Sequence, residues 1–206
     1  MASIIKLRET AAMINQFQYD RLTGLYSKEF FYQKVKEQLQ KDPAQEYTIV
    51  CTNIENFKLY NDNFGVAAGD SFLQKMARLL REKSGEDAIC GRFDADRFLC
   101  LQKREQEQKD RILISEDYTP AIKNVVIKWG IYEITDRTVP VEQMCDRALL
   151  AVDSIKGQYN RHFALYDDEL RGKLLREKAI TDAMETALDE GQFVVYFQPK
   201  YSLNTA

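Results

Sequence analysis

The sequence predicts an α/β sandwich in which helices cover a sheet with a central antiparallel hairpin. Residues 89–101 contain two short apolar runs on either side of the polar turn Asp-Ala-Asp-Arg, a pattern typical of a β-hairpin. Residues 47–53 are continuous, apolar and rich in β-branched side chains, which indicates a central strand covered on both faces. Segments with apolar residues at helical spacing separate these strands, so we expect one sheet flanked by helices.

The composition limits the class of protein. The chain has 206 residues, of which 45% are hydrophobic and 30% are charged, as expected for one ordinary domain with flanking segments. Its net charge of −3 and the lack of a basic block argue against a nucleic-acid partner. No apolar run is long enough to span a membrane and no signal peptide is recognisable, so we expect no membrane contact in this piece and a cytoplasmic location.

The four cysteines are far apart in the sequence and lie in apolar settings. Metal sites use closely spaced pairs of cysteines, which this sequence lacks. We therefore expect all four to be buried thiols of a reducing compartment. They are Cys51, Cys90, Cys100 and Cys145.

The first helices are predicted from periodicity and caps. Residues 3–18 have helical apolar spacing and form either a connector from an upstream module or an N-terminal helix docked on the fold. Ser27 is a suitable N-cap for a helix through Lys41, and Pro43 ends it.

The later elements follow in order. A short helix is predicted over 57–62, a loop over 65–69, and Asp70 as the cap of the next helix. Beyond the hairpin, the charged residues 103–117 form a solvated helix or loop. The remaining predicted elements are a strand over 124–134, a helix over 141–155 that begins near Pro140, and a strand over 162–166.

Polar side chains gather where the hairpin turns and the central strand ends. Asp94 and Asp96 are two residues apart, so on extended backbone both could face one side and hold a cation, or a polyphosphate through a cation. The alternative is a simple polar turn, which aspartate also favours. Asn53 stands at the end of the central strand, and the topology brings it within reach of Asp94 and Asp96.

Four motifs together resemble the GGDEF domain of diguanylate cyclases. They are Asp-Arg-Leu-Thr-Gly-Leu-Tyr at 20–26, Asn-Ile-Glu-Asn-Phe-Lys-Leu-Tyr-Asn-Asp at 53–62, Gly-Val-Ala-Ala-Gly-Asp at 65–70 and Arg-Phe-Asp-Ala-Asp-Arg-Phe at 92–98. The resemblance implies a nucleotidyl-cyclase palm fold with a ferredoxin-like core. It also implies one GTP per subunit in a head-to-head dimer, and synthesis of cyclic di-GMP with the help of a divalent metal.

The metal and catalytic positions depart from the family pattern. The resemblance implies Mg²⁺ ligands at Asn53, at the backbone of Ile54 and at Asp96, but Asn53 is a neutral amide where the family has aspartate. Arg97 stands at an acidic position needed for catalysis, and its cation repels Mg²⁺. We expect a weakened Mg²⁺ site and no intact catalytic residue.

Two further departures concern the phosphates. Asp94 and Ala95 replace the family's Gly-Gly pair, whose backbone allows close approach of the ligand. Ungapped alignment puts Asp153 at the position of a phosphate-contacting lysine, whereas Lys156 fits there only with an insertion.

The guanine pocket is better retained. Asn61 and Asp70 match the two family residues that bond the base edge, through an amide and a carboxylate. Phe57 and Lys58 match the turn whose backbone amides hold the phosphates. The alternative is that Asp70 is kept as a helix cap and Asn61 as a turn residue.

The C-terminal region has a different pattern. Residues 167–190 have long helical periodicity that Gly191 ends, and residues 193–200, Phe-Val-Val-Tyr-Phe-Gln-Pro-Lys, resemble the opening strand of an EAL phosphodiesterase domain. The alternative is a plain terminal strand. The expected organisation is a connector helix over 1–18, a degenerate GGDEF domain over 19–166, a linker helix over 167–191 and the first strand of a truncated EAL domain over 192–206.

The leading hypothesis is an inactive GGDEF domain that regulates the adjoining phosphodiesterase in cyclic di-GMP signalling. It would bind GTP through Asn61 and Asp70, with Asp96 and Arg97 near the phosphates. The expected partners are GTP, the downstream EAL domain and a second copy in a homodimer. Two alternatives remain: an active diguanylate cyclase, or a dimerisation and interaction module with a relic pocket.

Overall fold

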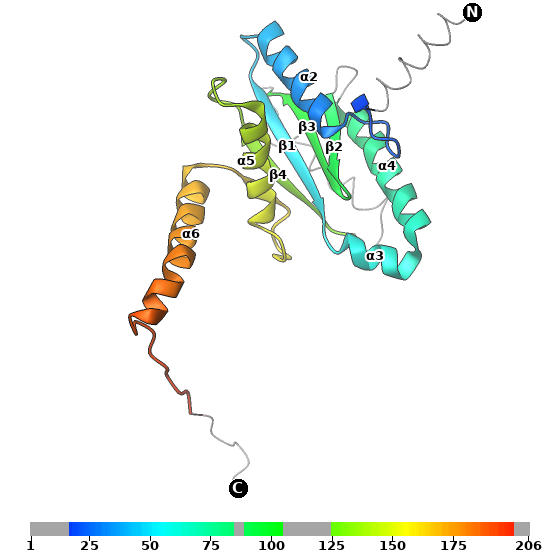
Figure 1. Cartoon of the computed structure of the whole chain (residues 1–206). Helices are drawn as coiled ribbons and strands as arrows, with labels where there is room; N and C mark the ends of the chain where they lie inside the picture. The colour runs from blue at the N-terminus through cyan, green and yellow to red at the C-terminus, as the bar shows by residue number, and fades with distance from the viewer. Residues whose placement is uncertain (1–16, 85–88, 105–124, 200–206) are drawn as a thin grey trace, which may run out of the picture. The chain divides into compact units, whose positions relative to one another are not determined.

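The computed structural model describes residues 17–84, 89–104 and 125–199, which fall into two compact units that meet between Tyr166 and Asp167. The first unit contains a five-stranded mixed sheet with the strand order β2-β3-β1-β4-β5 (Figure 1). Only the β4–β5 pair is parallel; the other pairs are antiparallel. The strands are β1 (Tyr47–Ile54), β2 (Ile89–Asp94), β3 (Arg97–Lys103), β4 (Ile127–Glu133) and β5 (Phe163–Leu165). The predicted α/β sandwich is confirmed, but the hairpin lies at one side of the sheet, where β2 is the edge strand, and the central strand is β1.

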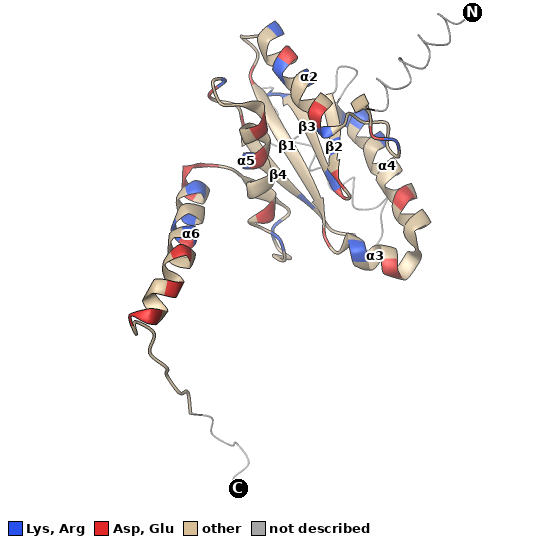
Figure 2. Cartoon of the chain, viewed as in Figure 1, with Lys and Arg blue, Asp and Glu red and all other residues tan. Residues whose placement is uncertain are grey.

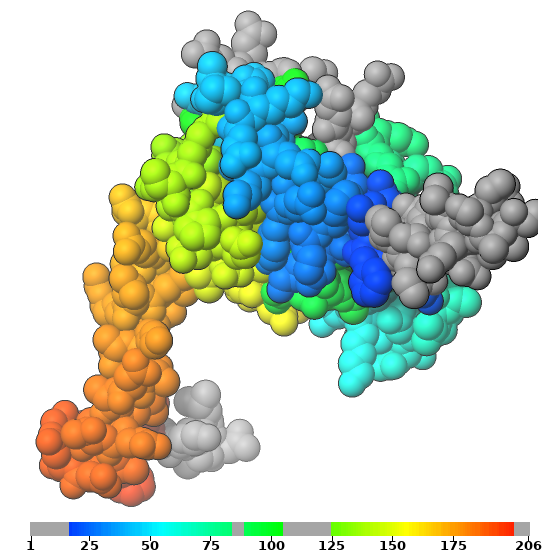
Figure 3. All heavy atoms as spheres, turned by 45° about the horizontal axis from the view of Figure 1, so that its top comes forward, coloured from blue at the N-terminus to red at the C-terminus, as the bar shows by residue number. Residues whose placement is uncertain are grey.

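Helices cover both faces of this sheet. One face packs against α3 (Phe57–Phe64) and α4 (Val66–Ser84), and the other against α2 (Lys28–Lys41) and α5 (Val141–Asp153). Figure 3 shows α2 and α5 side by side over their face. Because both faces are covered, every residue of β1 is buried, as its continuous apolar sequence predicts.

Local sequence signals set the ends of the helices that hold the site. The hydroxyl of Ser27 caps α2 by accepting a hydrogen bond from the Phe30 amide. Pro140 precedes the first residue of α5, as predicted. Gly130 of β4 lets the backbone of α5 approach closely, because a Cβ there would lie 2.1 Å from the Ala148 carbonyl oxygen. This close packing places the C-terminal end of α5 against the sheet.

The prediction that Asp70 caps a helix is wrong. Gly65 alone separates α3 from α4, and its positive φ of 84° provides the turn between the two helices. The amides of Ala68 and Gly69 already donate to the Gly65 carbonyl, so α4 begins at Val66 and includes most of the predicted 65–69 loop. Asp70 therefore lies inside the helix, where its carboxylate is not needed as a cap.

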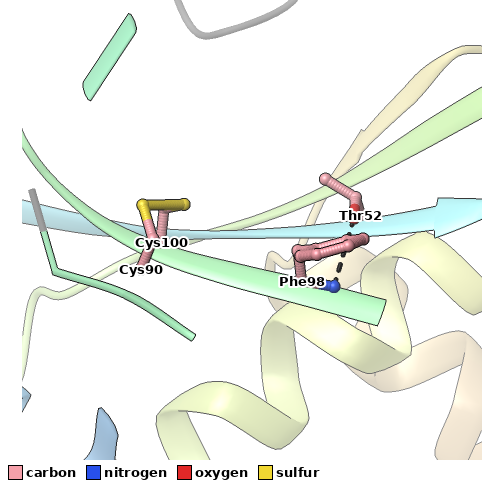
Figure 4. The surroundings of a disulfide bond; sticks show 4 residues. All are labelled: Thr52, Cys90, Phe98 and Cys100. Atoms are coloured by element: carbon pink, nitrogen blue, oxygen red, sulfur yellow. Dashed lines mark hydrogen bonds between the residues drawn. A yellow bond between two sulfur atoms is a disulfide. The ribbon is translucent and has the colours of Figure 1, made fainter. Parts of the chain in front are cut away.

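The cysteines also depart in part from expectation. Cys90 and Cys100 are direct partners in the β2–β3 register, with 4.2 Å between their Cα atoms, and they form a disulfide (Figure 4). Both residues were expected to be free thiols; separation along the chain concealed that the hairpin places them opposite each other. Cys51 and Cys145 are free and buried, as predicted, and burial raises the pKa of both thiols.

The second unit contains α6 (Asp168–Asp189), whose first turn is capped by the carboxylate of Asp167. The chain from 193 to 199 forms neither helix nor strand, so the strand expected there is not formed in its described part. An isolated strand has no neighbour with which to hydrogen-bond, and its formation requires one. The predicted N-terminal helix, except for its last two residues, and most of the charged segment after β3 lie outside the described residues.

Candidate functional site

The two residues of the expected guanine pocket lie on neighbouring helices, Asn61 on α3 and Asp70 on α4. The side-chain oxygen Oδ1 of Asn61 is buried and accepts no hydrogen bond from any described residue. The position of this side chain depends on Gly69, because a Cβ there would lie 1.9 Å from Asn61 Oδ1. Buried polar atoms normally have partners, so an unpaired acceptor in this place suits a donor supplied by a ligand.

Asp70 follows Gly69 on the same helix. Its half-buried carboxylate forms no hydrogen bond or ion pair within the described part of the chain. Neither Oδ1 of Asn61 nor the carboxylate of Asp70, which the sequence analysis assigned to one pocket, therefore has a partner among the described residues. The turn between the two helices holds Asn61 and Asp70 on neighbouring elements.

The N-terminus of α3 is also without a side-chain cap. Asn56 precedes it in the left-handed conformation and makes no capping hydrogen bond, and the first turn carries no acidic residue. Phe57 packs its ring into the core, whereas Lys58 is exposed. Uncapped amides at a helix N-terminus bind anions well, which agrees with the phosphate-holding role predicted for the backbone at Phe57 and Lys58.

The end of the central strand is organised differently. Asn53 is buried, and its register partner on β4 is Lys128. On the other side of β1, Thr52 pairs with Phe98 of β3. The next pair in this antiparallel register sets Asn53 beside Arg97. A neutral amide therefore lies between two cationic residues on neighbouring strands.

Arg97 is paired with an acidic residue. Its guanidinium Nη2 donates to both carboxylate oxygens of Asp153, at 3.0 and 3.2 Å. Asp153 is the last residue of α5, which the close approach at Gly130 holds against the sheet. Two apparent departures from the family pattern, Arg97 and Asp153, thus form one ion pair.

Lys128 is fully buried and has its own partners. Its ammonium Nζ donates to the carbonyl oxygens of Gln158 and Arg161 and lies 3.8 Å from Oε1 of Glu55. The same carboxylate oxygen accepts a hydrogen bond of 2.7 Å from the amide of Gly157. This network ties the loop after α5 to the ends of β1 and β4.

The sequence analysis did not single out Lys128. A lysine inside the otherwise apolar run of residues 125–131 was the available signal, since lysine is almost never fully buried without a partner. Its partners were harder to predict because two of them are backbone carbonyls of a loop that follows another helix.

The hairpin turn is held by a second arginine. Arg92 donates to both carboxylate oxygens of Asp20, at 3.2 and 3.3 Å, and to the carbonyl of Ala95 in the turn, at 2.7 Å. Burial raises the pKa of Asp20, but hydrogen bonds from Thr23 and the charge of Arg92 outweigh it, so the pKa is lowered overall. This contact connects the chain before α2 with the turn of the hairpin.

The two aspartates of the turn are not arranged as expected. Asp94 is the last residue of β2 and is exposed, whereas Asp96 lies in the two-residue turn before β3. The expectation that both lie on one stretch of extended backbone is therefore wrong, because the chain reverses between them. The sequence analysis also predicted that the hairpin turn lies near the end of the central strand. The register agrees with this, because Asn53 lies beside Arg97, the residue after Asp96.

Comparison with known proteins identifies the family. The model of the family "Diguanylate cyclase, GGDEF domain" matches residues 17–161. The chain belongs to the GGDEF family. The chain is 22% identical to the cyclic di-GMP phosphodiesterase NbdA of Pseudomonas aeruginosa over 205 residues, which cover 94% of this chain and 26% of NbdA. It is 33% identical to the diguanylate cyclase DgcP of Escherichia coli over 103 residues, which cover 48% of this chain and 30% of DgcP.

Solved structures agree on the fold of this GGDEF domain. The GGDEF domain of TpbB from Pseudomonas aeruginosa superimposes with a TM-score of 0.65 at 19% identity, over 76% of this chain and 99% of that one. The predicted nucleotidyl-cyclase palm fold is confirmed. The chain spans about a quarter of the length of NbdA. No helix among the described residues is both long and apolar enough to cross a membrane.

The resemblance implies Mg²⁺ in a GGDEF domain, but the side chains at this site do not fit it. Mg²⁺ prefers carboxylate oxygens, and Asn53 offers only an amide. Arg97 and Lys128 add positive charge on both neighbouring strands. Within the described ranges, no three or more His, Cys, Asp or Glu side chains are grouped so that they could hold a metal ion.

Proposed function

We propose that this GGDEF domain makes no cyclic di-GMP and instead binds GTP to regulate a phosphodiesterase domain in the same protein. The observation that carries the proposal is the buried Oδ1 of Asn61, which no described residue satisfies, together with the carboxylate of Asp70 on the next helix, which has no partner among the described residues either. Guanine offers hydrogen-bond donors at N1 and N2, which match two acceptors of this kind. The uncapped start of α3 supplies amides for the phosphates.

The charges at the end of β1 support inactivity. The family resemblance implies that phosphoryl transfer needs metal ions held by carboxylates. The metal ions neutralise the charge that develops on the phosphates. Here Arg97 is bonded to Asp153, and Lys128 lies near the carboxylate of Glu55. Asn53 is neutral and lies between two cations, and the carboxylates of Asp153 and Glu55 are associated with those cations, so the site is not suited to hold metal ions for this chemistry.

Relatives support the link to a phosphodiesterase. The alignment with NbdA covers 94% of this chain, so it continues well beyond the GGDEF domain into α6. PdeB of Shewanella oneidensis, also named a cyclic di-GMP phosphodiesterase, aligns over 88% of this chain at 21% identity. In the proposal, α6 connects the GTP-binding domain to an EAL domain that begins near residue 192.

Calorimetric titration of GTP into the 206-residue chain, with and without Mg²⁺, tests the binding step. We expect micromolar affinity, about −8 kcal/mol, that Mg²⁺ does not improve. Asp70→Ala and Asn61→Ala abolish or strongly weaken it, whereas Asn63→Ala, an exposed neighbour on α3, serves as the matched control and leaves it unchanged. The same samples are assayed for cyclic di-GMP, of which we expect none.

Each other result favours one alternative. Formation of cyclic di-GMP with Mg²⁺ or Mn²⁺ would establish an active cyclase and overturn the proposal. No GTP binding would leave a dimerisation or interaction module with a relic pocket. Binding that ignores both substitutions would place the nucleotide elsewhere on the chain.

A further inference from the structure

The groups suited to a base and the groups suited to phosphates differ in what they leave free for a ligand. Oδ1 of Asn61 and the carboxylate of Asp70 have no partner among the described residues, so both can accept hydrogen bonds from a guanine base. Arg97 and Lys128 are the cations on the two strands beside Asn53, and both are bonded to groups of the same chain. The acceptors for a base are therefore free, whereas the cations that suit phosphates are occupied.

The start of α3 sets the place for a phosphate group. Phe57, the first residue of α3, follows Asn53 by four residues, so the two lie at most about 14 Å apart along the chain. A phosphate group bound by the uncapped amides of α3 is therefore close to the end of β1. Further phosphate groups of the same ligand would extend either toward that strand end or into solvent.

Neither cation of the strand end is free to bind a second or third phosphate group. The guanidinium of Arg97 donates to both carboxylate oxygens of Asp153, at 3.0 and 3.2 Å. The ammonium of Lys128 has no exposed surface; it donates to two backbone carbonyls and lies 3.8 Å from a carboxylate oxygen of Glu55. A phosphate group would have to displace these partners, and exchanging one partner of a charge for another gains little.

Metal ions and exposed charges do not replace these cations. Mg²⁺ commonly bridges the outer phosphates of a nucleoside triphosphate, but the side chains here do not fit Mg²⁺. Figure 2 shows basic and acidic residues together on α3 and at the turn between β2 and β3, and Lys58 and Asp94 are exposed examples. Charges surrounded by water are screened, so this mixture favours no particular number of phosphate groups.

We propose that the site binds guanosine nucleotides through the base and one phosphate group, and does not distinguish GTP from GDP or GMP. The inference rests on the proposed function, because it concerns the same two acceptors, Asn61 and Asp70. It adds the class of ligand: the domain responds to the total concentration of guanine nucleotides and not to GTP alone.

Calorimetric titration of the 206-residue chain without Mg²⁺ tests this proposal, with GTP, GDP, GMP, guanosine and AMP as the ligands. We expect the dissociation constants of the three guanine nucleotides to agree within about threefold. Guanosine, which lacks a phosphate group, is expected to bind at least about tenfold more weakly. AMP is the matched control for the base, because adenine has no hydrogen-bond donor at N1 or N2, and we expect it not to bind.

The possible outcomes separate this proposal from the proposed function. If GDP and GMP bind at least about tenfold more weakly than GTP, this proposal is overturned and GTP binding stands. Guanosine that binds as tightly as GMP would show that no phosphate group is held, which would also overturn it. If no guanine nucleotide binds, or if Asn61→Ala and Asp70→Ala leave binding unchanged, the proposed function fails and this proposal fails with it.

A charge variant tests the physical reason for the lack of discrimination. Asp153→Ala removes the partner of Arg97 and frees its guanidinium for an outer phosphate group. We expect the affinity for GTP to rise about fivefold relative to that for GMP, because hydrogen bonds between charged groups are strong. Asp146→Ala is the matched control, since it removes the same charge from an exposed position of α5 that is not bonded to Arg97. An unchanged ratio of the two affinities in Asp153→Ala would overturn this explanation.

Discussion

The expected guanine pocket on α3 and α4 and the end of the sheet at Asn53 are close in sequence but are built in opposite ways. On α3 and α4, Oδ1 of Asn61 and the carboxylate of Asp70 have no partner in the part of the chain that the structure describes. At the end of the sheet, Arg97 and Lys128 are each engaged by groups of the same chain. The first arrangement is suited to a ligand, and the second is complete without one.

This difference changes how the departures from the family pattern are interpreted. Considered separately, Arg97 replaces the catalytic acid that the resemblance implies, and Asp153 replaces the implied phosphate-contacting lysine. Together they are a charge-reversed pair that fastens the C-terminal end of α5 to β3. Substitutions at the end of the sheet should therefore affect stability, whereas substitutions in the pocket should affect binding with little change in stability.

The largest expected effect is that of removing the buried cation. Lys128→Met leaves the carboxylate of Glu55 without its nearby cation and two carbonyls without a donor, and breaking a buried ion pair costs about 3–5 kcal/mol. Urea unfolding measures the loss. The double variant Lys128→Met/Glu55→Gln should recover part of it, and an unchanged unfolding midpoint in the single variant would show that the network contributes nothing.

The next effect concerns binding. Gly69→Ala introduces a Cβ that would lie 1.9 Å from Asn61 Oδ1, so the amide must rotate away. We expect GTP affinity to fall about tenfold, the value of one hydrogen bond, with a free energy of unfolding close to that of the unmodified chain because alanine favours helix.

Calorimetry on a double-variant cycle gives the cause of that loss. If Gly69→Ala acts through Asn61, adding it to Asn61→Ala weakens binding no further. Additive losses would mean that the methyl group itself blocks the ligand.

A smaller effect is expected at the exposed ion pair. Arg97→Glu sets two carboxylates against each other, and pairs of this exposure contribute about 0.2–1 kcal/mol. The reversed pair Arg97→Glu/Asp153→Lys should regain the lost stability in urea unfolding. If the double variant is no more stable than the sum of the two single variants predicts, the two side chains are not coupled.

The smallest effect is a dependence on pH. The lowered pKa of Asp20 means that the folded state binds this proton more weakly than the unfolded state does. The contribution to stability is therefore present above the unfolded pKa, about 4, and is lost as the pH falls through the lower folded value. Thermal unfolding of Asp20→Asn should show a deficit at pH 7 that narrows below pH 4; a constant deficit would contradict this assignment.

The sequence allowed most of the fold to be predicted because its signals are local. The continuous apolar run of β1, the cap at Ser27 and the polar turn of the hairpin each act within a few residues. The predicted start of α4 was wrong, because Gly65 permits a turn between the two helices that is tighter than the predicted loop. The Cys90–Cys100 disulfide was harder to predict, because Cys90 lies four residues before the end of β2 and Cys100 three residues after the start of β3, and only a register shift in the hairpin makes them direct partners.

The site was less predictable because its contacts join distant segments. The types of the residues at Asn61, Asp70 and Arg97 indicated what each could do, but not what each touches. The bond from Arg97 to Asp153 depends on the packing of α5 against β4, which no local pattern specifies. The unpaired oxygen of Asn61 likewise depends on a glycine of the next helix.

The disulfide of the hairpin turns residues 90–100 into a closed covalent ring (Figure 4). Two arginines lie inside this ring: Arg92, which donates to the turn, and Arg97, which pairs with Asp153. A protease that cuts once after either arginine would therefore leave the two halves of the chain joined. The nicked molecule would migrate as one species until a reductant separates it, and the signature turn could be cut without the strand being released from the sheet.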